Sequence, residues 1–225
     1  MIDIKQYTEE LYQYLKAFGD HHIAEKQSAY MRNRFPFIGI MKTEQQQHWH
    51  AYQELSGKIS GDMAVAFCKA CMAYPEREMW YIGQNTLIKA KNKLEKDDLV
   101  FVKELIVLSD WWDIVDGSAS HLVGALCKKF PELRSVVNGW IEHDNFWLRR
   151  TAILYQLGYK KDTDENTLYG HILKTCHEKE FFIRKAIGWS LREYSKHNSP
   201  SVRAFIEQNA GKLSALSIKE GSKYI

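Results

Sequence analysis

Residues 109–116 place two adjacent tryptophans among three acidic residues, and Asp116 is the acid whose position could serve chemistry. On a helix, Trp112 lies four residues before Asp116 and therefore on the same side, while Trp111 points about 100° away, toward the expected core. A carboxylate beside an indole on a partly apolar face carries a desolvation cost unless a cation compensates for it. We therefore expect Asp116 to face a basic side chain or a cationic ligand.

The other two acids of this segment have a structural interpretation. Asp110 fits the N-cap of a helix that begins at the tryptophans. Asp113 fits the third helical position, where a carboxylate favours the free N–H groups and the helix dipole.

Arg150 is the candidate within the protein for the cation beside Asp116. It shares a helical face with Trp147, Leu154 and Leu157, which is an awkward position for a charge without a partner. One interpretation is a buried Asp116–Arg150 ion pair that fastens neighbouring repeats. The other is a pair of residues that face a ligand, and spacing alone leaves both open.

A second candidate group lies on the helix expected near residues 182–196. At 100° per residue, four side chains fall within about 60° of one another: Lys185, Trp189, Arg192 and Lys196. Apolar residues occupy the opposite side: Ile183, Ile187, Leu191 and Tyr194. The first face could be solvated surface, but a large ring set between three cations suits contact with phosphate and sugar better.

Cysteine and histidine spacing gives little support to metal chemistry. Cys68 and Cys71 form a C-x-x-C pair, but a second pair with ligand spacing is missing among the four cysteines. The two thiols are expected as small buried side chains on a helix. The nine histidines form no metal-binding pattern, and we expect no metal site.

Composition predicts an ordinary soluble protein. The chain has 225 residues, of which 45% are hydrophobic and 26% charged. It lacks both the apolar run of a membrane span and the layout of a signal peptide, so an intracellular location with free thiols is expected. Residues 1–120 hold 14 Lys/Arg against 17 Asp/Glu, whereas residues 121–225 hold 17 against 11, which hints at a polyanionic partner.

The elements that position these residues are predicted to be helices throughout. Apolar residues recur at spacings of three and four, as in residues 4–15 and 99–106, and strict alternation is nowhere sustained. Prolines stand near expected helix boundaries, at Pro75, Pro131 and Pro200. Polar breaks at residues 161–166 and 197–200 are typical of turns between helices, so the fold class is all-α.

An internal repeat refines this fold class. The aromatic pairs Trp111-Trp112, Phe146-Trp147 and Phe181-Phe182 are separated by 35 residues each time, and each is expected to open a helix after a polar residue. A helix pair that recurs at this period favours a curved α-solenoid (α-α superhelix) of HEAT-like helical repeats. We expect residues 1–225 to form a single domain with a concave surface.

Four segments, in order, carry a family resemblance: residues 30–35 with 39–40, residues 109–116, residues 144–150, and residues 180–189 with 191–194. Together they resemble the AlkD-type alkylpurine DNA glycosylases, a family of DNA alkylation repair enzymes with HEAT-like repeats. The resemblance covers nearly the whole chain. Repeats alone would be a weak signal, because such scaffolds do many things.

The resemblance implies specific site residues. In the family, a tryptophan, an aspartate, an arginine and a second tryptophan line the cleft where damaged DNA lies; the matching residues are Trp112, Asp116, Arg150 and Trp189. The expected DNA contacts are Tyr30, Lys185, Arg192 and Lys196. The family excises positively charged N3- and N7-alkylated purines, such as 3-methyladenine and 7-methylguanine, from duplex DNA.

That chemistry gives each residue an expected role. An ionised Asp116 would stabilise the positive charge that develops on the deoxyribose. Trp112 and Trp189 would cradle the damaged nucleotide, and Arg150 would hold a phosphate or keep Asp116 oriented and ionised. The scheme requires no metal and no organic cofactor, and we expect a cytoplasmic monomer that associates with the nucleoid when bound to DNA.

Two other function classes stay open from the sequence. One is a DNA-binding HEAT-repeat protein without glycosylase activity that recognises distorted or branched DNA. The other is a protein-interaction scaffold whose aromatic residues are ordinary repeat packing.

Overall fold

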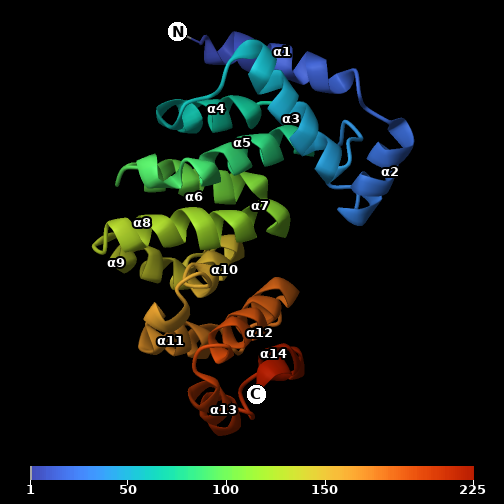
Figure 1. Ribbon diagram of the computed structural model, residues 1–225. Helices are drawn as coiled ribbons and strands as arrows, with labels where there is room; N and C mark the ends of the chain where they lie inside the picture. Colours follow the sequence, from blue (N-terminus) through green and yellow to red (C-terminus); the bar gives the residue numbers. More distant parts are fainter. Residues whose placement is uncertain (1) are drawn as a thin grey trace. The chain divides into compact units, whose positions relative to one another are not determined.

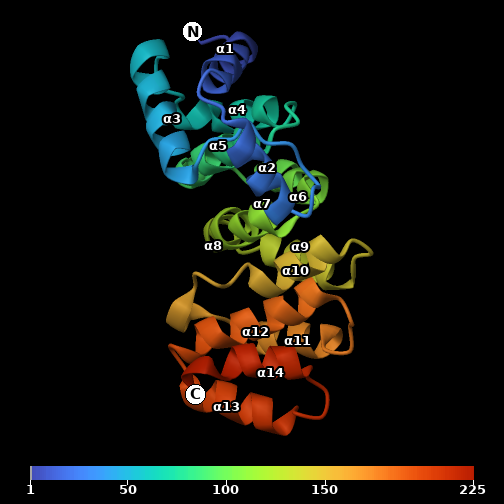
Figure 2. The same ribbon diagram turned by 90° about the vertical axis from the view of Figure 1, so that its right-hand side faces the viewer.

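The computed structural model describes residues 2–225, and these form helices and connecting turns without a strand (Figures 1 and 2). The prediction of an all-α fold of the α-solenoid class is confirmed. The chain divides into two compact units, which end and begin at Lys93 and Leu94. The expected single domain stays a prediction.

The first unit contains five α-helices: α1 (Ile4–Lys16), α2 (His21–Tyr30), α3 (Lys42–Ser56), α4 (Ala64–Cys71) and α5 (Arg77–Lys89). The unit also contains two short 3-10 turns: η1 (Gly61–Met63) precedes α4, and η2 (Lys91–Lys93) follows α5. Aromatic and aliphatic side chains share the core of this unit, and Trp49 stacks on Phe67 with ring centroids 5.3 Å apart. Cys68 and Cys71 are fully buried on α4, as expected for small core side chains.

Helix α2 differs from its neighbours because it buries none of its residues. Polar contacts hold it instead: Gln27 donates to the carbonyl of Ile40 at 2.9 Å, and the amide of Asp20 donates to the carbonyl of Gly39 at 3.1 Å. Gly39 has a φ of +94°, and a Cβ there would lie 2.0 Å from the Asp20 carbonyl oxygen. Only glycine fits this close approach.

The second unit begins with one separate helix and a longer helical run after it. Helix α6 (Asp98–Ser109) precedes α7 (Trp112–Gly117), a π-helical turn η3 (Ser118–Val123) and α8 (Gly124–Lys129). The last three segments continue one another without a break in helical backbone geometry, so the run carries one extra residue in a turn directly after Asp116.

The remaining elements of the second unit are α9 (Leu133–Gly139), η4 (Trp140–Glu142), α10 (Phe146–Leu154), η5 (Lys160–Asp162), α11 (Glu165–Thr175), α12 (Phe181–Ser195), α13 (Ser199–Gln208), α14 (Ala215–Gly221) and η6 (Ser222–Tyr224). Both views show α14 beside α12 (Figures 1 and 2). Gly188 permits this proximity, because a Cβ there would lie 2.5 Å from the Cβ of Glu220 on α14.

The repeated aromatic residues form one packed cluster in the second unit. The ring of Phe182 lies 5.3 Å from Trp111 and 4.9 Å from Trp147, and Phe146 lies 4.4 Å from Trp147 between centroids. Helices α10 and α12 do begin at their aromatic pairs, after Asn145 and Glu180. The repeat therefore places the first turns of three helices against one another.

No helix among the described residues is long and apolar enough to cross a membrane. Across residues 2–225, no group of three or more His, Cys, Asp or Glu side chains gathers in a way that could hold a metal ion.

Candidate functional site

Asp116 and Arg150 form a bidentate ion pair between α7 and α10. Arg150 donates from Nε to Oδ1 of Asp116 at 2.7 Å and from Nη2 to Oδ2 at 2.8 Å. Its third nitrogen, Nη1, donates to the carbonyl of Phe182 in the first turn of α12. One guanidinium thus links three helices of the unit, α7, α10 and α12. This is the buried ion pair that was one of the two interpretations left open by the sequence.

The two partners differ in exposure. The Asp116 side chain retains 17% of its surface exposed, whereas Arg150 retains 5%. Arg150 uses its three nitrogens on protein oxygens, so these contacts favour orientation of Asp116 over capture of a phosphate as its role. The carboxylate is the member of the pair with surface left for a ligand.

Burial and the ion pair act on the Asp116 carboxyl in opposite directions. Burial raises its pKa above the usual 3.8, Arg150 lowers it through hydrogen bonding and charge, and the nearby Asp113 raises it further. The outcome is a raised pKa, since desolvation is the largest of these effects.

The N-cap expected at Asp110 is wrong. Helix α7 begins at Trp112 with Trp111 as its cap residue, while Asp110 ends α6 in a left-handed conformation with a φ of +45°. Its carboxylate accepts a hydrogen bond from Nε1 of Trp147 at 2.8 Å. Asp113 does lie in the first turn of α7, and its side chain accepts from the amide of Ile114 at 2.9 Å.

Of the predicted tryptophans, two are core and two remain partly exposed. Trp111 is buried, as expected, and Trp147 is buried beside it. Trp112 and Trp189 are half-buried. Trp112 lies one turn before Asp116 on α7, and Trp189 lies two turns along α12 from the Phe182 carbonyl that Arg150 contacts.

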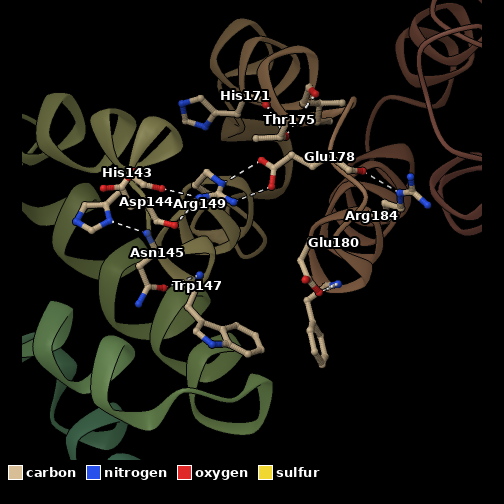
Figure 3. Close-up of polar contacts among 12 residues, drawn as sticks. His143, Asp144, Asn145, Trp147, Arg149, His171, Thr175, Glu178, Glu180 and Arg184 are labelled. Carbon is tan, nitrogen blue, oxygen red and sulfur yellow. Dashed lines mark hydrogen bonds and ion pairs between the residues drawn. The ribbon is translucent and has the colours of Figure 1, made fainter.

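Arg149 fixes the loops from which α10 and α12 start. It donates from Nε and Nη2 to the two oxygens of Glu178, at 3.0 and 2.8 Å. Its Nη1 donates to the carbonyls of His143 and Asp144, at 2.7 and 2.9 Å. Figure 3 shows Arg149 between the two loops, with Arg184 donating to the Glu178 carbonyl from the other side. Arg150 and Trp189 therefore stand on helices whose first turns are tied together.

The predicted basic face of α12 is present, and acidic side chains occupy part of it. Lys185, Trp189 and Arg192 are half-buried and Lys196 is exposed, while the opposite apolar side is buried as expected. Lys185 and Arg192 both pair with Glu220 of α14, at 3.1 and 2.7 Å. Lys196 pairs with Glu193 at 2.7 Å.

Tyr30 belongs to the first unit and is 71% exposed at the end of α2. The two residues that follow Met31, Arg32 and Asn33, have positive φ angles of 57° and 55°. The return of the loop is held by Glu78, which accepts from the amides of residues 38–40 at 2.9 to 3.2 Å.

Sequence reasoning missed Glu220 and Glu178, which organise the predicted site residues of the second unit, and Glu78, which holds the loop after Tyr30 in the first unit. Each accepts from a group at least 28 residues away along the chain, and local spacing does not predict such a contact. Glu220 also has a local partner, Lys223. The internal repeat does single out Arg149, because Arg149 and Arg184 occupy the same position after their aromatic pairs. The repeat does not predict which groups Arg149 contacts.

Chemically, the second unit combines an oriented carboxylate, two partly exposed indoles and a cluster of cations. A carboxylate in a partly desolvated position stabilises positive charge more strongly than it would in water. Indole faces also attract cations, and the lysines and arginine suit phosphate. The set fits an anionic polymer that carries a locally cationic group.

Comparisons with known proteins agree with this description. The family model described as DNA alkylation repair enzyme matches residues 11–225. Among solved structures, the chain is similar to a "Predicted DNA alkylation repair enzyme from Enterococcus faecalis", with 30% sequence identity and a TM-score of 0.82. That similarity covers 92% of this chain and 96% of the other. No curated protein is significantly similar to the chain.

Proposed function

The chain belongs to the DNA alkylation repair enzyme family and has a role in DNA repair, and from this we propose that it is a monofunctional DNA glycosylase. Its proposed substrates are purines alkylated at N3 or N7 in duplex DNA, such as 3-methyladenine and 7-methylguanine. The observation that carries the proposal is the partly exposed Asp116 carboxylate, oriented by Arg150 and one turn from Trp112.

The charge of the substrate explains why so few groups suffice. Alkylation at N3 or N7 makes the base cationic, so cleavage of the N-glycosidic bond returns the bonding electrons to the base, which leaves as a neutral molecule. Protonation of the leaving group by a general acid is therefore unnecessary. The costly feature is the positive charge at C1′ of the deoxyribose, where a water molecule adds and releases a proton.

Asp116 is proposed to stabilise that sugar cation and to position the attacking water. Arg150 is proposed as the group that orients the carboxylate and favours its ionised form, since its donors are engaged with Asp116 and the Phe182 carbonyl. The negative charge is thus in place before the substrate arrives, which is the condition for electrostatic preorganisation.

The remaining predicted residues are assigned to binding. Trp112 and Trp189 are proposed to contact the damaged nucleotide with electron-rich ring faces. Lys185, Arg192 and Lys196 are proposed to contact backbone phosphates, and Tyr30 a further part of the duplex. The scheme uses HEAT-like repeats as a scaffold, draws on no metal or organic cofactor, and needs one copy of the chain.

The direct test is incubation with duplex DNA that contains 7-methylguanine, followed by detection of the free base. We expect release of 7-methylguanine without strand cleavage, because the proposed enzyme has no lyase step. Undamaged duplex of the same sequence is the control. Failure to release the base at high protein concentration, with binding to DNA intact, contradicts the proposal.

One observation favours a second candidate, a non-catalytic protein that binds distorted or branched DNA. Both Asp116 oxygens are bonded to Arg150, as a purely structural ion pair would require. The base-release assay separates the two functions when branched DNA is tested beside the 7-methylguanine duplex. The second candidate predicts that the protein binds branched DNA and releases no free base from either DNA.

A further inference from the structure

Glu220 of α14 is surrounded by three cations. Oε1 accepts from Lys185 at 3.1 Å, and Oε2 accepts from Arg192 at 2.7 Å and from Lys223 at 2.8 Å. Lys185 and Arg192 lie four residues before and three residues after Trp189, so they flank this indole on one face of α12. The carboxylate therefore occupies a position that an anion would find favourable beside Trp189.

The packing of α14 on α12 builds this position. Gly188 leaves room for the Cβ of Glu220, and Gly221 lies against Leu191, where a Cβ would be 3.1 Å from the Leu191 Cβ. The hydroxyl of Ser217 donates to the carbonyl of Arg184 at 2.9 Å, which fixes α14 along α12. Glu220 keeps 13% of its side-chain surface exposed. Hydrogen bonds and charge from Lys223 and Lys185 lower its pKa to about 2, so it stays ionised at neutral pH.

The cations keep more exposure than the acid that they surround. Lys185 and Lys223 retain 39% and 46% of their side-chain surface, and each ammonium has donors beyond the one directed at Glu220. A DNA phosphate at this face would compete with Glu220 for the same ammonium and guanidinium groups. Repulsion between phosphate and carboxylate would oppose binding wherever both are present.

We propose that Glu220 is an internal counter-ion that DNA phosphates must displace from Lys185 and Arg192, and that it thereby limits the affinity of the protein for undamaged DNA. The inference rests on the proposed function insofar as this face of α12 is the one that contacts DNA. Its consequence for repair is selectivity: a cationic lesion held by Asp116 and the indoles adds binding that undamaged duplex lacks.

The test compares wild-type protein with Glu220→Gln, which keeps the shape of the side chain and removes its charge. The matched control is Glu142→Gln. Glu142 also pairs with a lysine, Lys174, at 2.5 Å, and the substitution removes one negative charge, as Glu220→Gln does. Fluorescence anisotropy on an undamaged duplex is measured over a salt series. Release of 7-methylguanine is measured in parallel.

We expect Glu220→Gln to bind undamaged duplex about three- to tenfold more tightly at low salt, with a log–log salt slope steeper by about one. Glu142→Gln should match the wild type. An unchanged or weakened affinity in Glu220→Gln, or an equal gain in Glu142→Gln, overturns the proposal. Weakened binding would assign Glu220 the opposite role, that of orienting the cations for phosphate.

A measurement on unmodified protein keeps the proposal testable if the variant is unstable. Displacement of Glu220 releases ion pairs between α14 and α12, so hydrogen exchange in α14 should become faster when undamaged duplex is bound. Slower or unchanged exchange overturns the proposal. Because these readouts concern binding, absence of 7-methylguanine release in wild-type protein would reject the glycosylase function and leave the role of Glu220 to be judged separately.

Discussion

At the scale of single residues, Asp116 and Arg150 form the ion pair on which the proposed chemistry depends. Each was an awkward charge on a partly apolar face, so a partner for each was predictable from spacing. The bidentate geometry of the ion pair was not predictable. The orientation of the guanidinium is also fixed by the Phe182 carbonyl, which lies 32 residues away along the chain and accepts a hydrogen bond from Nη1 of Arg150. The roles of Asp116, Trp112 and Trp189 stay predictions.

Replacing Asp116 by asparagine tests the charge that we propose to be catalytic. We expect 7-methylguanine release to fall by about 10²-fold or more, the scale of removing a preorganised electrostatic group. Binding to undamaged duplex should change little, since the carboxylate contributes nothing favourable to phosphate. Single-turnover base release and anisotropy measure the two effects, and an unaltered release rate would reject the proposed role.

The pH dependence of activity follows from the raised pKa of Asp116. Activity needs the ionised form, so it should be lost as pH falls, with a midpoint above 3.8 because burial raises this pKa. Arg150 opposes that rise, so Arg150→Gln should move the acid limb of the rate profile to higher pH. Lys174→Gln is the control, and an acid limb that stays in place after Arg150→Gln contradicts the coupling.

At the scale of elements, apolar periodicity predicted the helices, and polar residues before aromatic pairs predicted two helix starts. Asn145 and Glu180 do cap α10 and α12, with side chains that accept from Trp147 and Phe182. The same logic failed at Asp110. There the left-handed end of α6 turns the carboxylate toward Trp147, a tertiary contact with no local signature.

The packing of α14 on α12 yields a prediction for Gly188. A methyl group there would meet the Glu220 Cβ at 2.5 Å and the Ser217 carbonyl oxygen at 3.0 Å, so Gly188→Ala should destabilise the protein by about 1–3 kcal/mol. Gly170→Ala on α11 is the matched control, because nothing lies within 4 Å of its added Cβ. That change should stabilise the helix by up to about 1 kcal/mol. Urea denaturation measures both, and equal effects would contradict the close approach.

At the scale of the whole molecule, the balance of charge between the two parts of the chain depends on where the chain is divided. Divided at residue 120, the sequence has an acidic first part and a basic second part. The structural division at residue 93 removes this contrast, since residues 2–93 hold 12 Lys/Arg against 10 Asp/Glu and residues 94–225 hold 19 against 18. The second unit holds both Asp116 and the basic face of α12, and its total charge is nearly neutral. Attraction to DNA must therefore come from local clusters of cations.

Salt dependence measures those clusters. Around Trp189, two acids, Glu193 and Glu220, pair with four cations: Lys185, Arg192, Lys196 and Lys223. The excess of about two positive charges predicts that binding to undamaged duplex has a log–log salt slope of about −2 or steeper. Lys196→Gln should make the slope shallower by about one, whereas Lys174→Gln, with the same change in net charge, should leave it unchanged. Anisotropy titrations from about 50 to about 200 mM salt cover the useful range. A slope near zero, or equal effects of the two variants, would contradict binding through this face.

The π-helical turn η3 has a consequence for reading related sequences. Its wider turn absorbs one extra residue, so loss of one residue from Ser118–Val123 with a return to α-helical winding would leave Asp116 and the helix that follows in nearly the same relative orientation. A homologue with that deletion would therefore keep its aspartate and arginine within reach of each other. A one-residue gap at this place in a pairwise alignment should not be taken as evidence that the site has been lost.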